Sequence, residues 1–244
     1  MNEARFSDQL TFASQAAVDE RADFITKTYV HLAGAVGAFA ALCALFLHPS
    51  IDMGRVIAQL ALGNGTIGMV VFFGCFMGIS WLANSWAMSS ASQPLQYAGL
   101  SLYVVAQAIF FAPLLFIAHN MVGPEVIPTA GVMTFVVFAG LTLIVFLTRY
   151  NFSFLGPALG VVGFAVMAMF LCSMIFGYNL SSLGIWLPAG MVVFAGCYIL
   201  YDTSNVMHQY RIGQHVAASL ALFSSVTLLF YYMVRLVMSL QRND

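Results

Sequence analysis

The sequence predicts an all-α polytopic membrane protein, a bundle of seven transmembrane helices, and three observations lead to this fold class. Hydrophobic residues make up 61% of the 244 residues and charged residues only 7%, against about 25% in a typical soluble domain. Eight charged side chains lie in the first 27 residues, and none lies between Val56 and Pro124. Seven apolar runs each approach the roughly 20 residues with which a helix crosses a bilayer.

This composition excludes several classes of protein. A soluble enzyme, a nucleic-acid-binding domain and a disordered chain all need far more polar surface than this chain provides. The net charge of −1 offers no basic surface for nucleic acid. A transmembrane β-barrel would show strands of about 10 residues with alternating polarity, whereas these apolar runs are continuous and much longer. Helices are therefore the predicted membrane-crossing elements.

Proline and glycine stand at most of the joints between the predicted helices, where the backbone leaves the lipid. In chain order the predicted helices cover residues 26–47, 66–88, 95–118, 126–148, 154–176, 185–205 and 216–240. Pro113 falls inside the third helix and is expected to kink it. Residues 1–25 form an N-terminal tail, either mobile or a short surface helix, and residues 241–244 form a C-terminal tail.

The orientation in the membrane follows from the Lys and Arg residues of the short loops, which favour the cytoplasmic side. With the N-terminus inside, five basic residues lie on the inner side and two on the outer side. The inner residues are Arg5, Arg21, Lys27, Arg149 and Arg211, and the outer residues are Arg55 and Arg242. The chain is therefore expected to be a multi-pass protein of the cell membrane with a cytoplasmic N-terminus.

Asp202 is the ionisable residue that points most clearly to a function, because a carboxylate in a membrane-spanning segment is costly. If the sixth helix continues to His208, Asp202 lies about 9 Å from its end. Tyr198 and Asn205 share its helix face at positions i−4 and i+3. Either this polar stripe faces the interior of the bundle, or Asp202 simply ends the helix in headgroup water.

The seventh helix offers hydroxyl groups as partners for Asp202. Ser224, Ser225 and Thr227 either allow close helix packing, or Ser225 or Ser224 donates its hydroxyl to the carboxylate. Gln107 and His31 stand alone in apolar runs and are expected to form hydrogen bonds between helices. No His, Cys, Asp and Glu residues show metal-ligand spacing, and no nucleophile stands near a base. The chain is therefore expected to be no enzyme and to hold neither a metal nor a cofactor.

Two segments indicate a family. Residues 198–208, YILYDTSNVMH, resemble the sixth-helix signature of the Bax inhibitor-1 family of seven-helix membrane proteins. Residues 148–156, TRYNFSFLG, are similar to the loop before the fifth helix of that family, usually T-x-x-D-x-S-x-x-G. The loop positions singled out are Arg149, Asn151, Ser153 and Gly156. The resemblance extends from about residue 24 to the end of the chain.

Among bacterial members of the family, the sequence looks most like the YccA branch. That resemblance implies a protein of the bacterial inner membrane that is a modulator and substrate of the membrane-bound AAA protease FtsH. Two positions depart from the family pattern. Members that leak calcium in response to pH pair two Asp residues, and here Asp202 matches the first while Ser225, or Ser224, stands at the second. Asn151 stands where the loop usually has Asp.

A single Asp beside a Ser cannot share a proton as two carboxylates do, so two functional hypotheses stay open. The first is a regulator that binds partner membrane proteins, a membrane-bound AAA protease complex above all, through its helices and N-terminal tail. The second is a passive Ca²⁺ or H⁺ leak with Asp202 in the pathway. An intramembrane enzyme would need a nucleophile–base pair or a metal cluster, and the sequence indicates neither. Ion flux through the purified protein in liposomes separates the first two hypotheses.

Overall fold

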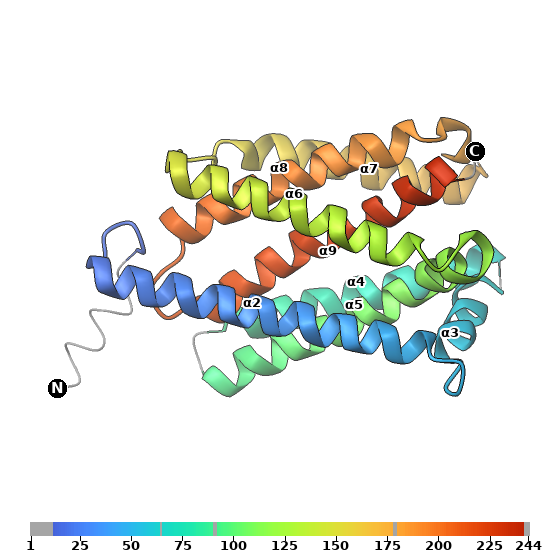
Figure 1. Ribbon diagram of the computed structural model, residues 1–244, viewed down its shortest axis with the longest axis horizontal. Coiled ribbons are helices and arrows are strands. Elements are labelled where there is room, and N and C mark those ends of the chain that lie inside the picture. Colours follow the sequence, from blue (N-terminus) through green and yellow to red (C-terminus); the bar gives the residue numbers. More distant parts are fainter. Residues whose placement is uncertain (1–11, 64, 90–91, 178–179, 242–244) are drawn as a thin grey trace. The chain divides into compact units, whose positions relative to one another are not determined.

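The computed structural model describes residues 12–63, 65–89, 92–177 and 180–241, and their regular elements are helices (Figure 1). The α-helices are α2 (Val18–Leu47), α3 (Met53–Leu62), α4 (Gly65–Ala87), α5 (Gln93–Ile117), α6 (Val126–Thr148), α7 (Leu155–Phe176), α8 (Trp186–His208) and α9 (His215–Gln241). A π-helical turn, η1 (Ala118–Val122), extends α5, and a 3₁₀ turn, η2 (Leu180–Leu183), precedes α8. Residues 1–11 of the predicted N-terminal tail and 242–244 of the C-terminal tail lie outside the described residues.

A long helix occupies each of the seven predicted ranges. Among the described helices, six are long and apolar enough to cross a membrane: Val18–Leu47, Gly65–Ala87, Gln93–Val122, Val126–Thr148, Leu155–Ser173 and His215–Gln241. The remaining long helix, α8, carries Asp202, Asn205 and His208 near its end, and polar residues of this kind lower its hydropathy. The described part of the chain therefore has six candidate membrane-spanning helices, and a seventh crossing by α8 stays a prediction.

The first helix begins earlier than predicted, at Val18 instead of residue 26. Asp19 and Glu20 lie in its first turn, where negative side chains interact favourably with the helix dipole. One turn further on, the Lys27 ammonium lies 2.6 Å from the Asp23 carboxylate, and such i,i+4 pairs support a helix. Charged residues assigned to a tail thus extend the apolar helix at its start.

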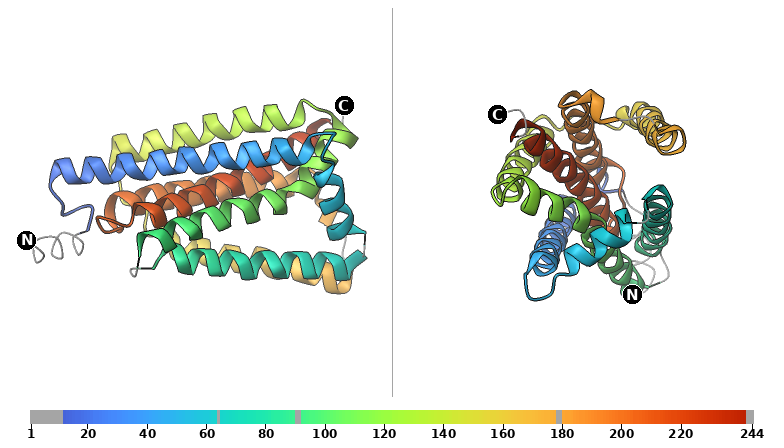
Figure 2. Two further views of the ribbon diagram at one scale, coloured as in Figure 1. Left: turned by 90° about the horizontal axis from the view of Figure 1, so that it is seen from below. Right: turned by 90° about the vertical axis from the view of Figure 1, so that its right-hand side faces the viewer.

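The chain divides into two compact units, one within Met1–Phe116 and Asp202–Ser224, the other within Ile117–Tyr201 and Ser225–Asp244. The core of the first unit contains aromatic rings from α2, α5 and α9. The ribbons of α2 (blue), α5 (green) and the first part of α9 (red) lie side by side (Figure 2). The Phe39 ring meets Phe111 edge-on at 5.0 Å and Phe223 at 5.8 Å between centroids. All three side chains are buried, and edge-to-face geometry is the favoured arrangement for such rings.

Helices α4 and α5 of the first unit lie side by side and antiparallel. Gly99 makes this possible, because a Cβ atom there would lie 2.6 Å from the Ala83 carbonyl oxygen and 2.7 Å from the Ala87 nitrogen. Small residues allow such close approach of helices in membranes.

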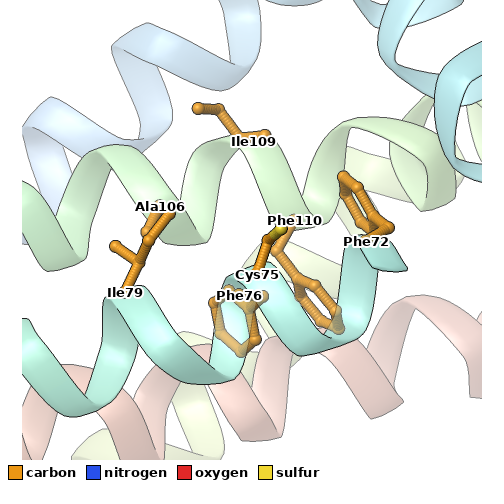
Figure 3. Close-up of a pocket in the computed structure, with 7 residues that line it drawn as sticks. All are labelled: Phe72, Cys75, Phe76, Ile79, Ala106, Ile109 and Phe110. Atoms are coloured by element: carbon orange, nitrogen blue, oxygen red, sulfur yellow. The ribbon is translucent and has the colours of Figure 1, made fainter. Parts of the chain in front are cut away.

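Further along, the two helices leave an apolar groove of about 130 Å³ (Figure 3). Its lining consists of Phe72, Cys75, Phe76, Ile79, Ala106, Ile109 and Phe110.

The second unit contains α6, α7, the first part of α8 and the part of α9 that begins at Ser225. A Cβ atom on Gly163 of α7 would lie 3.7 Å from the Tyr198 hydroxyl of α8, which is ordinary van der Waals distance. On α8 itself, a Cβ atom on Gly196 would lie 3.3 Å from the Leu141 side chain of α6. Glycines therefore line the contacts of α8 with both neighbouring helices in this unit.

Candidate functional site

Asp202 lies in the most polar stretch of α8. Its side chain is half-buried, and the next three residues, Thr203, Ser204 and Asn205, are buried. The helix ends six residues after Asp202, where the Asn205 carbonyl accepts hydrogen bonds from the N–H groups of Gln209 at 2.8 Å and Tyr210 at 3.1 Å. At 1.5 Å per residue, Asp202 is about 9 Å from this end. The carboxylate thus has buried polar neighbours within one turn.

Ser224, one of the two predicted partners of Asp202, takes part in a network that joins α5 to α9 in the first unit. Its hydroxyl lies 3.0 Å from the Tyr103 hydroxyl, which also accepts a hydrogen bond from the Gln107 side-chain amide at 3.2 Å. Tyr103 and Gln107 are buried. Hydrogen bonds between buried polar side chains of two helices hold those helices in a defined register.

Tyr103 is not among the site residues predicted from the sequence. The signal was present, because Tyr103 and Gln107 are one turn apart and therefore share a face of an otherwise apolar helix. The Gln107 amide donates to Tyr103 of its own helix, and Tyr103 makes the contact with α9. The predicted hydrogen bond from Gln107 itself to another helix stays a prediction.

The remaining members of the predicted Asp202 site divide between the two units. Asn205 and Ser224 belong to the first unit with Asp202, whereas Tyr198 and Ser225 belong to the second. The Ser225 side chain is buried. The hydrogen bond from Ser224 or Ser225 to the Asp202 carboxylate stays a prediction. Among the described residues, no group of three His, Cys, Asp or Glu side chains is placed to hold a metal ion.

The loop between α6 and α7 explains how Asn151 replaces the expected Asp. Arg149 ends α6 in the left-handed backbone conformation, with φ of 51°. The Asn151 side-chain oxygen then accepts a hydrogen bond from the Ser153 N–H at 3.0 Å, and the Ser153 carbonyl accepts one from the Gly156 N–H at 3.1 Å. Asp and Asn both form this type of turn, so the substitution preserves the entry into α7.

The two segments that carry the family resemblance meet in the second unit. A Cβ atom on Gly156 of the loop segment would lie 2.9 Å from the Tyr201 ring of α8. Glycine at position 156 therefore leaves the room that the Tyr201 side chain fills. The loop segment in this way supports the α8 residue directly before Asp202.

The chain ahead of α2 docks on the loop between α8 and α9 in the first unit. The Ala13 N–H donates to the Tyr210 carbonyl at 2.9 Å, and Phe12 pairs with Arg211 as a single antiparallel bridge. Ala13 is fully buried, and the Arg211 guanidinium lies 5.4 Å from the centre of the Phe12 ring. At least part of the predicted tail is thus held against the loop that follows the Asp202 helix.

The chain matches one protein-family model and several known proteins. The family model described as "Inhibitor of apoptosis-promoting Bax1" matches residues 21–243. Bax inhibitor 1 of Schizosaccharomyces pombe is 27% identical over 96% of this chain and 83% of its own length. An uncharacterized protein of Pseudomonas aeruginosa is 28% identical over 73% of this chain and 76% of its own. Protein LIFEGUARD 4 of Arabidopsis thaliana is 31% identical over 56% and 55%, respectively. No solved structure matches the chain.

Proposed function

Because the chain belongs to the Bax inhibitor-1 family and is a multi-pass integral membrane protein, we propose that it is a membrane regulator that acts by contacts with partner membrane proteins. The proposed partner is a membrane-bound AAA protease, as in the YccA branch, and the proposed location is the bacterial inner membrane with the N-terminus in the cytoplasm. Residues 1–11 serve as the handle that the partner engages.

The docked N-terminal segment carries this proposal. Backbone hydrogen bonds join it to Tyr210 in the short connection between α8 and α9. A force or a binding event on residues 1–11 therefore acts directly on that connection, because Ala13 is only two residues further along the chain. This connection directly follows α8, the helix that carries Asp202. Partner binding at residues 1–11 can therefore shift the end of α8 and the polar residues around Asp202.

A crosslinking experiment tests whether the partner binds residues 1–11. A photo-crosslinking amino acid at position 5 is expected to trap the AAA protease in membranes, and the same group at Leu60 of α3 is not. Leu60 is a suitable control because it is exposed and lies on the predicted outer side. Deleting residues 1–11 should abolish modulation of the protease, measured as the degradation rate of a membrane substrate in proteoliposomes. An unchanged degradation rate after this deletion would refute the proposal that the partner acts through residues 1–11.

The contact between the N-terminal segment and the connection between α8 and α9 can be tested separately. Ala13→Pro removes the N–H that donates to Tyr210 at 2.9 Å and the ring also restricts the backbone. We expect this variant to keep the crosslink at position 5 but to lose most of the effect on protease rate. Gln15→Ala, a change at an exposed side chain, is the matched control and should behave as wild type. Equal protease modulation by Ala13→Pro and Gln15→Ala would show that the hydrogen bond from Ala13 to Tyr210 plays no part in modulation.

The passive Ca²⁺ or H⁺ leak is the second candidate function, and the half-buried carboxylate of Asp202 among buried polar residues favours it. Under the regulator proposal, liposomes with the purified protein alone show no flux above empty liposomes. Asp202→Asn keeps the size and a hydrogen-bonding group, so it should change the unfolding free energy by only about 1 kcal/mol. Flux of Ca²⁺ or H⁺ that Asp202→Asn abolishes would instead establish the leak and displace the regulator proposal.

A further inference from the structure

Three polar side chains from three helices of the first unit meet away from the Asp202 stripe. The His31 Nε2 atom of α2 lies 3.1 Å from the Tyr97 hydroxyl of α5, and that hydroxyl lies 3.4 Å from the His215 Nε2 atom of α9. The two imidazole rings are 5.0 Å apart between centroids. The Nε2 atoms of His31 and His215 therefore both face the Tyr97 hydroxyl oxygen.

The hydrogen bond on the other side of His31 defines which of its nitrogens is available. His31 Nδ1 lies 2.6 Å from the Lys27 carbonyl oxygen. A carbonyl oxygen only accepts, so Nδ1 carries the ring proton and Nε2 presents its lone pair toward Tyr97. Histidines that bind metals characteristically donate their second N–H to a carbonyl or carboxylate, which fixes the tautomer and the ring orientation.

The distances from the Tyr97 oxygen to the two imidazole nitrogens also match those between ligands around one metal ion. Imidazole nitrogens bind divalent transition metals at about 2.0–2.1 Å. Two ligands at that distance with an angle of about 90–109° between them are roughly 2.9–3.4 Å apart. The distances of 3.1 Å from the Tyr97 oxygen to His31 Nε2 and of 3.4 Å to His215 Nε2 fall in this range. Lys27 is the cation nearest in sequence to His31, and its ammonium pairs with the Asp23 carboxylate at 2.6 Å. The pair has no net charge, so it does not repel a bound cation.

We propose that His31, Tyr97 and His215 form a binding site for a divalent transition-metal ion, with Cu²⁺ bound more tightly than Zn²⁺. Two imidazole nitrogens and one phenol oxygen are a mixed N,O donor set, which suits Cu²⁺, and Cu²⁺ stands above Zn²⁺ in the general order of affinities. Tyr97 is 40% exposed and lies in the second turn of α5, next to a predicted cytoplasmic loop from which an ion can reach the site. Binding through the phenolate oxygen breaks the Tyr97 O–H bond and releases that proton to solvent.

Calorimetric titration of the purified full chain in detergent micelles with Cu²⁺ and with Zn²⁺ tests the site. One ion per chain is expected, with Cu²⁺ tighter than Zn²⁺ and with a proton released on Cu²⁺ binding. Loss of an outer-shell partner alone typically costs about 10–100-fold in metal affinity. His31→Gln and His215→Gln remove direct ligands, so each should weaken Cu²⁺ binding by at least about 10-fold. Tyr97→Phe should weaken it and abolish the proton release. The control variants His48→Gln and His119→Gln change histidines outside the cluster and should bind as wild type.

One further variant separates loss of the site from loss of the fold. Tyr97→His creates three imidazole ligands, so it should raise the affinity for Zn²⁺ above that of wild type, which a misfolded chain would not do. Absence of binding by the wild type would overturn the proposal, and so would equal Cu²⁺ affinity in the wild type and His215→Gln. A loss of binding in His48→Gln as large as that in His31→Gln would overturn it as well. These outcomes do not depend on protease modulation or ion flux.

Discussion

Gly99→Ala is expected to separate α4 from α5 and to destabilise the protein by about 1–3 kcal/mol. The added Cβ atom would lie 2.6 Å from the Ala83 oxygen and 2.7 Å from the Ala87 nitrogen. Both are backbone atoms of a helix, so no side-chain rotation relieves the clash. Alanine gains up to about 1 kcal/mol in helix propensity over glycine, but the steric cost exceeds this gain. Gly99→Leu should be worse still.

The measurement is the apparent melting temperature of the purified protein in detergent. A loss of 1–3 kcal/mol corresponds to a decrease of roughly 3–10 °C for a chain of this size. Gly78→Ala on α4 is the matched control, because nothing lies within 4 Å of the position that its Cβ would take. That variant should be neutral or slightly stabilising. If Gly99→Ala melted at or above the Gly78→Ala temperature, the close approach of α4 and α5 would be wrong.

Phe223→Ala is expected to cost about 2–4 kcal/mol, because this fully buried ring fills the space between α2, α5 and α9. Its ring centroid lies 5.8 Å from that of Phe39 and 6.0 Å from that of Tyr103. Truncation of a buried Phe costs about 3–5 kcal/mol in soluble cores. Part of that cost is transfer from water, which is smaller in a membrane, whereas the lost packing contacts remain.

The exposed ring of Phe164 on α7 provides the control for this change. Phe164 is 69% exposed, so Phe164→Ala should leave the melting temperature nearly unchanged while Phe223→Ala lowers it by roughly 5 °C or more. Phe223 precedes Ser224, so its loss should also loosen the Tyr103–Ser224 hydrogen bond. Equal melting temperatures for the two variants would contradict the aromatic core described for the first unit.

Local sequence features determined much of this fold. Apolar runs of bilayer length are a property of contiguous residues, so helices could be expected over residues 126–148 and 216–240, and helices are found at Val126–Thr148 and His215–Gln241. The polar stripe around Asp202 follows from helical periodicity alone. The Asn151 turn is also local, since it joins residues two positions apart. The early start of α2 was less predictable, because its first turns are charged and look like a tail.

Only the tertiary structure decided which residues face one another. The Tyr103–Ser224 hydrogen bond joins residues 121 positions apart, and the two contacts of Tyr97 with His31 and His215 span 66 and 118 positions. A helix in lipid is apolar on all sides, so its hydrophobic pattern does not mark the face that packs against other helices. On α6, for example, Val126 and Val145 are buried whereas Val132 and Val136 are exposed. The sequence by itself therefore determined the helices and the rare polar residues in them, while packing between helices decided which of those polar residues meet.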